Sequence, residues 1–169
     1  NGGAVFIDIG LALLFTKKYR KAGLAVIVAL IVMLLCNDLF LKEFFARPRP
    51  FNLFETNPEK YAFWGKGYIY PELISKPTSF SFPSGHTASA FAAVIALLWH
   101  NRKFGIPTTI FAALMGFSRI YVEVHYCTDV IAGVISGTIC AFVAVLIVKY
   151  LFPVVDKGLD KLFLKLKKN

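Results

Sequence analysis

Charged side chains are scarce in this sequence, and acidic ones are the scarcest. Charged residues make up 17% of the 169 positions and ten residues are Asp or Glu, whereas apolar residues make up 57%. A soluble domain of ordinary composition carries about 25% charged residues. The shortage argues against an ordinary soluble domain and indicates a membrane protein.

Cysteine is also rare, and internal repeats and low-complexity tracts are lacking. The three cysteines are an odd number, and two of them, Cys36 and Cys140, fall in apolar runs, where a free cysteine behaves as a small apolar residue. Cys127 lies near His125, and a disulfide there is disfavoured. Because no second compositional region is visible, we expect one membrane-embedded domain over residues 1–169, without a cofactor.

Long apolar runs predict an all-α, polytopic bundle of transmembrane helices with five segments. About 20 helical residues cross the roughly 30 Å of hydrocarbon in a bilayer. The candidate spans are Ala22–Leu41, Gly85–Trp99, Phe104–Val122 and Asp129–Phe152. The fifth segment, Ala4–Phe15, is too short to span alone. Since the sequence begins without methionine, either part of the N-terminus is missing or this segment is a half-helix or a tilted stub.

The net charge of +9 raises the possibility of nucleic acid, but the placement of the charges points to a membrane instead. Basic clusters follow the first segment, precede the fourth and follow the last; they are Lys17–Lys21, Arg102–Lys103, and Lys149 with the tail lysines. If the segments alternate in direction, these clusters share one face, which the positive-inside rule makes cytoplasmic. We therefore expect no nucleic acid partner and a bacterial inner membrane location; the oligomeric state stays open.

The connections Lys42–Pro83 and Arg119–His125 then lie together on the opposite face, toward the periplasm or the exterior. Aromatic residues crowd into positions 61–73 of the long connection, which predicts either an interfacial loop at the headgroup level or ordinary loop packing. The tail 154–169 alternates leucine and lysine at helical spacing. It is read as an amphipathic helix on an anionic leaflet or as a solvated basic tail.

The outer connections hold three cations that suit an anion, namely Lys42, Arg49 and Arg119. Arginine offers a planar fork that matches phosphate oxygens. Ser84 and Gly85 follow Pro83 at a predicted helix start, where free N–H groups and the helix dipole also favour phosphate. The alternative is that Ser84 merely caps the helix and the cations merely anchor to headgroups.

Two histidines lie on the same predicted face as the cations. His125 and Asp129 are four residues apart and share a face of a helical turn, so the carboxylate can hold one ring nitrogen and leave the other as a nucleophile. His86 is then free to protonate a departing oxygen, and phosphoryl transfer needs no metal. Zinc on His86, His125 and Asp129 is the competing interpretation, but the surrounding cations would repel it. Asp38, four residues before Lys42, can orient that lysine.

At these residues the sequence resembles the type 2 phosphatidic acid phosphatase superfamily, membrane lipid phosphatases related to vanadium haloperoxidases. The three parts of that signature occur in order and without departure. They are Lys42 with Arg49 and Pro50; Pro83, Ser84, Gly85 and His86; and Ser118 and Arg119 with His125 and Asp129. The family usually has six membrane helices, one more than the segments visible here.

The resemblance implies that His125 attacks phosphorus, that Asp129 fixes its tautomer and that His86 is the acid and base. It also implies that Lys42, Arg49, Ser84, Gly85 and Arg119 hold the phosphate. A lipid phosphate or diphosphate is the expected substrate; lipid A 1-phosphate is favoured over undecaprenyl diphosphate and phosphatidylglycerol phosphate. The alternatives are a lipid phosphotransferase and a transporter or lipid-binding protein without catalysis.

Overall fold

The computed structural model describes residues 2–56 and 74–168, and every regular element in these ranges is helical. The helices are α1 (Gly2–Phe15), a 3-10 turn (Lys17–Tyr19), α2 (Arg20–Met33), a π-helical segment (Leu34–Leu41), α3 (Lys42–Phe45), α4 (Pro50–Thr56), α5 (Gly85–His100), α6 (Arg102–Tyr121) and α7 (Cys127–Lys168). The predicted all-α class is confirmed. The stretch 61–73, expected at the membrane interface, lies outside the described residues.

Helix α5 packs against α2, α6 and α7 and forms the centre of the bundle. Small side chains along α5 allow the close packing, since Ala88, Ala92 and Ala96 are fully buried. On α7, a Cβ atom at Gly137 would lie 2.3 Å from the carbonyl oxygen of Ala88. The backbones of α5 and α7 are therefore in direct contact, as at other glycine-mediated helix crossings in membranes.

The outer surface of the bundle carries large apolar side chains at helical spacing. Residues on α7 that are more than half exposed include Ile131, Ile135, Ile139 and Leu146, and those on α6 include Ile106, Ile110, Leu114 and Phe117. Contiguous apolar surface of this kind is rare on soluble monomers. It suits helices that face lipid.

Two mainly helical segments in the described part of the chain, 17–53 and 127–167, contain an apolar stretch long enough to cross a bilayer. The sequence predicted four such spans. The difference comes from the two middle helices, because α5 has 16 residues and α6, with 20, includes Arg102, Lys103 and Arg119.

The first predicted span is not one regular α-helix. Its α-helical part ends at Met33, and residues Leu34–Leu41 form a π-helix. Within it, Asn37 is fully buried and its Oδ1 accepts a hydrogen bond from Ser136 Oγ at 3.1 Å. Hydrophobic periodicity does not distinguish this geometry from an α-helix, and π-helical turns are often found at functional sites.

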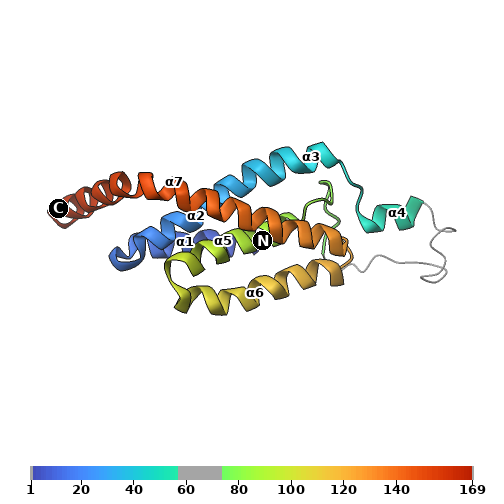
Figure 1. Cartoon of the computed structure of the whole chain (residues 1–169), viewed down its shortest axis with the longest axis horizontal. Helices are drawn as coiled ribbons and strands as arrows, with labels where there is room; N and C mark the ends of the chain where they lie inside the picture. Colours follow the sequence, from blue (N-terminus) through green and yellow to red (C-terminus); the bar gives the residue numbers. More distant parts are fainter. Residues whose placement is uncertain (1, 57–73, 169) are drawn as a thin grey trace.

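The predicted last span and the amphipathic tail form one helix, α7, of 42 residues. A buried cation holds the tail against the start of α2, because Arg20 Nη1 donates to Asp156 at 2.8 Å and to Asp160 at 2.6 Å. At about 1.5 Å per residue, α7 is roughly twice as long as the hydrocarbon core is thick. Its C-terminal part extends past the other helices, to the left of the bundle (Figure 1).

The predicted sorting of the connections onto two faces is confirmed. At one end of the bundle, the rings of Tyr19 and Phe104 lie 5.1 Å apart and Lys17 pairs with Asp160, which joins the three basic clusters. At the other end, Arg49 Nη1 donates to the carbonyl oxygen of Val124 at 2.9 Å and joins the two outer connections.

Candidate active site

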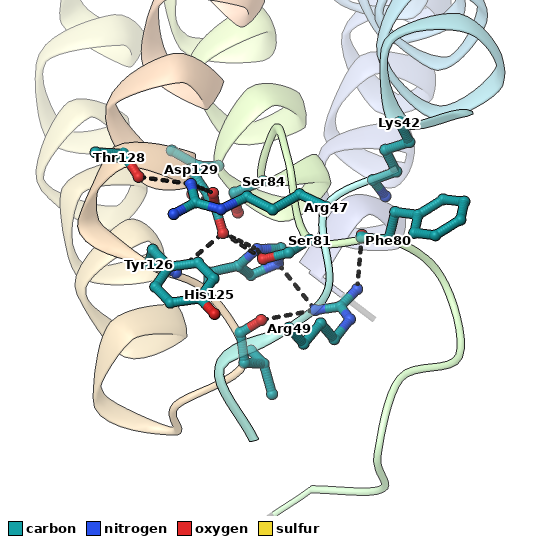
Figure 2. A network of polar contacts seen from close by, with 12 residues as sticks. Lys42, Arg47, Arg49, Phe80, Ser81, Ser84, His125, Tyr126, Thr128 and Asp129 are labelled. Carbon is teal, nitrogen blue, oxygen red and sulfur yellow. Dashed lines mark hydrogen bonds and ion pairs between the residues drawn. The ribbon is translucent and has the colours of Figure 1, made fainter. Parts of the chain in front are cut away.

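The three sequence blocks that carry the signature meet at one end of the bundle (Figure 2). Each predicted site residue lies at or near the end of a helix. Lys42 is the first residue of α3, and Arg49 directly precedes α4. Ser84 directly precedes α5, and Gly85 and His86 are its first residues. Arg119 lies in the last turn of α6, His125 lies between α6 and α7, and Asp129 lies in the first turn of α7. Six of these eight residues line one cavity of about 480 Å³; they are Lys42, Arg49, Gly85, His86, Arg119 and His125.

His125 and Asp129 are in contact, although not by the geometry expected. The sequence placed both on one helical face, whereas His125 lies in the loop before α7 begins at Cys127. Its Nδ1 is 3.4 Å from Oδ2 of Asp129, and both side chains are buried. Its Nε2 is 3.4 Å from Nη1 of Arg49. With Nδ1 on the carboxylate, Nε2 is the ring nitrogen that remains for the cavity.

The environment of His125 favours the neutral form of its ring. Burial lowers the pKa of His125 from its ordinary value of 6.5, and Arg49 lowers it further, while the hydrogen-bonding carboxylate of Asp129 partly opposes them. A neutral imidazole has a free lone pair on one nitrogen. This neutral form is the one that a nucleophilic histidine requires.

Asp129 receives polar contacts on both carboxylate oxygens (Figure 2). Oδ1 accepts from Arg47 Nη1 at 2.7 Å. Oδ2 accepts from the backbone N–H of Tyr126 at 2.9 Å and from the hydroxyl of Ser81. Sequence reasoning missed Arg47 and Ser81 because neither is one of the fixed residues of the signature blocks.

Arg49 is held rigidly at the wall of the cavity. Its side chain is buried, Nε donates to the carbonyl oxygen of Ser79 at 2.7 Å, and Nη2 donates to Ser79 Oγ at 3.0 Å and to the carbonyl oxygen of Phe80 at 3.2 Å. A guanidinium fixed by several acceptors loses little entropy on binding an anion. Arg49 is thus a preorganised cation beside His125.

The side chain of Lys42 lies against the backbone of Gly85. Lys42 Nζ lies 2.5 Å from Oδ1 of Asp38, which confirms the predicted pairing. A Cβ atom at Gly85 would lie 2.8 Å from that Oδ1 and 3.0 Å from Nζ. Gly85 therefore leaves the space that the ion pair occupies at the edge of the cavity.

Ser84 is placed differently from the other predicted phosphate ligands. It is fully buried, its Oγ accepts from Thr87 Oγ1 at 3.0 Å, and it makes no side-chain capping bond to the start of α5. Its backbone N–H donates to the carbonyl oxygen of Asp129 at 3.0 Å, which links the start of α5 to the start of α7. Its direct contact with phosphate stays a prediction.

The described residues do not assemble the donor set that the zinc alternative needs. Within 2–56 and 74–168, no group of three or more His, Cys, Asp or Glu side chains is placed to hold a metal ion. The carboxylate of Asp129 is instead engaged by Arg47 and Ser81.

Known proteins resemble this chain over most of its length. The sequence model of the PAP2 superfamily matches residues 11–153. An undecaprenyl-diphosphatase of Sulfolobus acidocaldarius is 33% identical over 142 residues, which is 83% of this chain and 62% of the relative. A lipid A 4'-phosphatase of Porphyromonas gingivalis is 32% identical over 132 residues, 75% of this chain and 52% of the relative.

A solved structure shares the fold. The crystal structure of a transmembrane PAP2 type phosphatidylglycerolphosphate phosphatase from Bacillus subtilis matches with a TM-score of 0.59 and 28% identity, over 83% of this chain and 65% of that one. The chain thus spans less than two thirds of the length of these relatives. With the family match over most of its residues, the chain belongs to the PAP2 superfamily.

Proposed function

We propose that this protein is a membrane lipid phosphatase that hydrolyses a phosphomonoester or diphosphate through a phosphohistidine on His125. One observation carries the proposal. The ring of His125 has Nδ1 against Asp129 and Nε2 beside Arg49, at a cavity that Lys42 and Arg119 also line. A nucleophile, its orienting carboxylate and three cations are sufficient for phosphoryl transfer through a covalent intermediate.

In the first step, the lone pair of His125 Nε2 forms a bond to phosphorus while the bond from phosphorus to the leaving oxygen breaks. His86, which lines the same cavity, takes up a proton when the anionic phosphate binds beside it and donates that proton to the leaving oxygen. Negative charge spreads over the three equatorial phosphoryl oxygens in the transition state. Lys42, Arg49 and Arg119 lie where they can stabilise it.

In the second step, water attacks the phosphorus of the phosphohistidine. His86 accepts a proton from that water, the N–P bond breaks, and its electron pair returns to Nε2 of His125. Inorganic phosphate leaves, and both histidines recover their starting protonation. No metal or cofactor takes part in this scheme.

A second cavity supports an amphiphilic substrate. It measures about 590 Å³, shares Lys42, Gly85 and His86 with the first, and continues along an apolar wall. That wall is formed by Ile7 of α1, by Leu30 and Met33 at the end of α2, and by Leu34 at the start of the π-helical segment. A phosphate at the cations can therefore have its hydrocarbon chain against the apolar wall, as a lipid requires.

The substrate belongs to the envelope lipid phosphates. The relatives are named for undecaprenyl diphosphate, lipid A and phosphatidylglycerol phosphate, and the expected preference for lipid A 1-phosphate stays a prediction. The basic clusters at the opposite end of the bundle favour a site that faces away from the cytoplasm.

Phosphate release by the detergent-solubilised protein tests the function on these three lipids, without an acceptor lipid. We expect release from at least one, its loss in His125→Ala, and its retention in His100→Ala, since His100 lies at the far end of α5 from His86. Acid-labile, alkali-stable ³²P on the wild type but not on His125→Ala would identify the intermediate. A folded, inert protein would contradict the proposal, and label passing only to an added lipid would indicate a phosphotransferase.

A further inference from the structure

Asp129 is a fully buried carboxylate that does not reach the cavity, so its effect on the reaction passes through His125. A buried carboxylate is costly unless charge and hydrogen bonds compensate it. Here the compensating charge is Arg47, whose Nη1 lies 2.7 Å from Oδ1. The other oxygen, Oδ2, faces His125 and accepts from Ser81 and the Tyr126 N–H.

The guanidinium of Arg47 is itself fixed from several sides (Figure 2). It lies over the ring of Tyr126, 3.9 Å from the centroid, and its Nη1 also donates to Thr128 Oγ1 at 2.7 Å. The chain reaches this place because Ala46, at the end of α3, adopts a left-handed conformation with φ 44°. Arg47 thus joins the segment after α3 to the start of α7.

Arg47 and Arg49 are two residues apart but have different surroundings. Arg49 lines the cavity beside His125, whereas Arg47 is not among the residues that line it. Arg47 instead contacts the side of Asp129 that is turned away from the imidazole, through Oδ1. Arg49 is therefore placed to contact a substrate in the cavity, whereas Arg47 contacts the carboxylate of Asp129.

We propose that Arg47 is a positioning residue for the reaction, which fixes the carboxylate of Asp129 so that Oδ2 holds His125 Nδ1, with Ser81 securing the same oxygen. This inference rests on the function proposed above. It assigns Arg47 a role through Asp129 and none in binding the phosphate.

The proposal makes a prediction about charge as well as geometry. The charged and titratable groups around His125 are Asp129 from α7, Lys42 from α3, His86 from α5, Arg119 from α6 and Arg49 from the segment before α4. Arg47 neutralises part of the field that Asp129 exerts on the imidazole. Without it the carboxylate attracts the imidazolium proton more strongly, and a higher pH is needed to free the nucleophile.

The test compares Arg47→Ala with Arg102→Ala, which removes an exposed arginine from the other end of the bundle. In Arg47→Ala we expect kcat to fall about tenfold or more, as when the orienting partner of a functional side chain is lost, with KM nearly unchanged. The acid limb of the pH profile moves to higher pH, and added guanidinium ion restores part of the rate. Arg102→Ala matches the wild type in all three measurements.

Arg47→Lys is the second variant of the test, and it is measured even if Arg47→Ala does not fold. It keeps the charge but loses the planar fork, so we expect a reduced kcat with the acid limb in its wild-type place. A rise in KM alone would place Arg47 on the substrate and overturn the proposal, as would an unchanged kcat and acid limb in both variants. A wild type inactive on all three lipids would instead overturn the proposed function.

Discussion

Nη1 of Arg49 lies 3.4 Å from Nε2 of His125 while it donates to the carbonyl oxygen of Val124 at 2.9 Å. One nitrogen from the segment before α4 therefore contacts both the backbone of the loop before α7 and the proposed nucleophile in that loop. A neutral Nε2 can accept from this donor at rest, and an incoming phosphate oxygen can replace it as the acceptor. The cation is in place before the negative charge of the transition state develops, which is the condition for strong electrostatic stabilisation.

Arg49→Lys tests this preorganisation. An ammonium ion cannot reach Ser79, Val124 and the phosphate at once, because it lacks the planar fork. We expect kcat/KM to fall about 10²–10³-fold, the size seen when one transition-state donor is removed. Steady-state rates beside those of Arg102→Lys measure the effect, and thermal unfolding checks the fold. A loss below threefold in a stable variant contradicts the role.

The loss of activity on replacing His86 is predicted to depend on the leaving group of the substrate. General acid catalysis contributes roughly 10²–10⁴-fold, and most of that is needed only when the departing oxygen is basic. His86→Ala should therefore lose far more activity on an alkyl phosphate than on an aryl phosphate, whose oxygen leaves without a proton. His100→Ala is the matched control on the same helix. Equal losses on both substrates would remove His86 from this role.

The pH dependence should follow the neutral form of His125. Because its pKa is lowered from 6.5, chiefly by burial, the acid limb of kcat/KM should lie below pH 6.5. The contribution of His125 to the stability of the fold should also decrease as the pH falls. The folded state binds this proton less readily than the unfolded chain, so the contribution is present above pH 6.5 and is lost as pH falls through the folded pKa. An acid limb above pH 7 contradicts the assignment.

The sequence predicted contacts within the candidate site where the spacing of two residues has a direct physical meaning. Lys42 is four residues from Asp38 in one helical stretch, so their contact follows from local geometry. His125 and Asp129 have the same spacing, but His125 makes its contact from the loop before α7. The meeting of the blocks followed from alternating helices and the distribution of basic residues. Residue spacing and the distribution of basic residues can both be read directly from the sequence, without knowledge of tertiary packing.

What the sequence did not reveal depends on the path of the backbone. Arg47 and Arg49 flank one proline, and nothing in their spacing tells which one meets the carboxylate and which the cavity. The left-handed turn at Ala46 contributes to that outcome. Likewise, the burial of Ser84 and the contact of Ser81 with Asp129 depend on how α5 packs against α7. Such contacts are settled by tertiary packing.

The contact between α5 and α7 gives a prediction about stability. A Cβ atom at Gly137 would lie 2.3 Å from the backbone oxygen of Ala88, which cannot move without displacing α5. We expect Gly137→Ala to destabilise the protein by about 1–3 kcal/mol, as overpacking typically does. Activity should fall as well, since the starts of these two helices hold His86 and Asp129.

Gly158→Ala is the control for that substitution, in the same helix. A Cβ atom at Gly158 has no neighbour within 4 Å among the described residues. Alanine is favoured over glycine in a helix interior by about 1 kcal/mol, so this variant should unfold at the same or a higher temperature. Thermal unfolding of both variants in one detergent decides the matter. Because helix propensity favours alanine at both positions, a lower midpoint for Gly137→Ala alone can be assigned to the loss of close contact with Ala88.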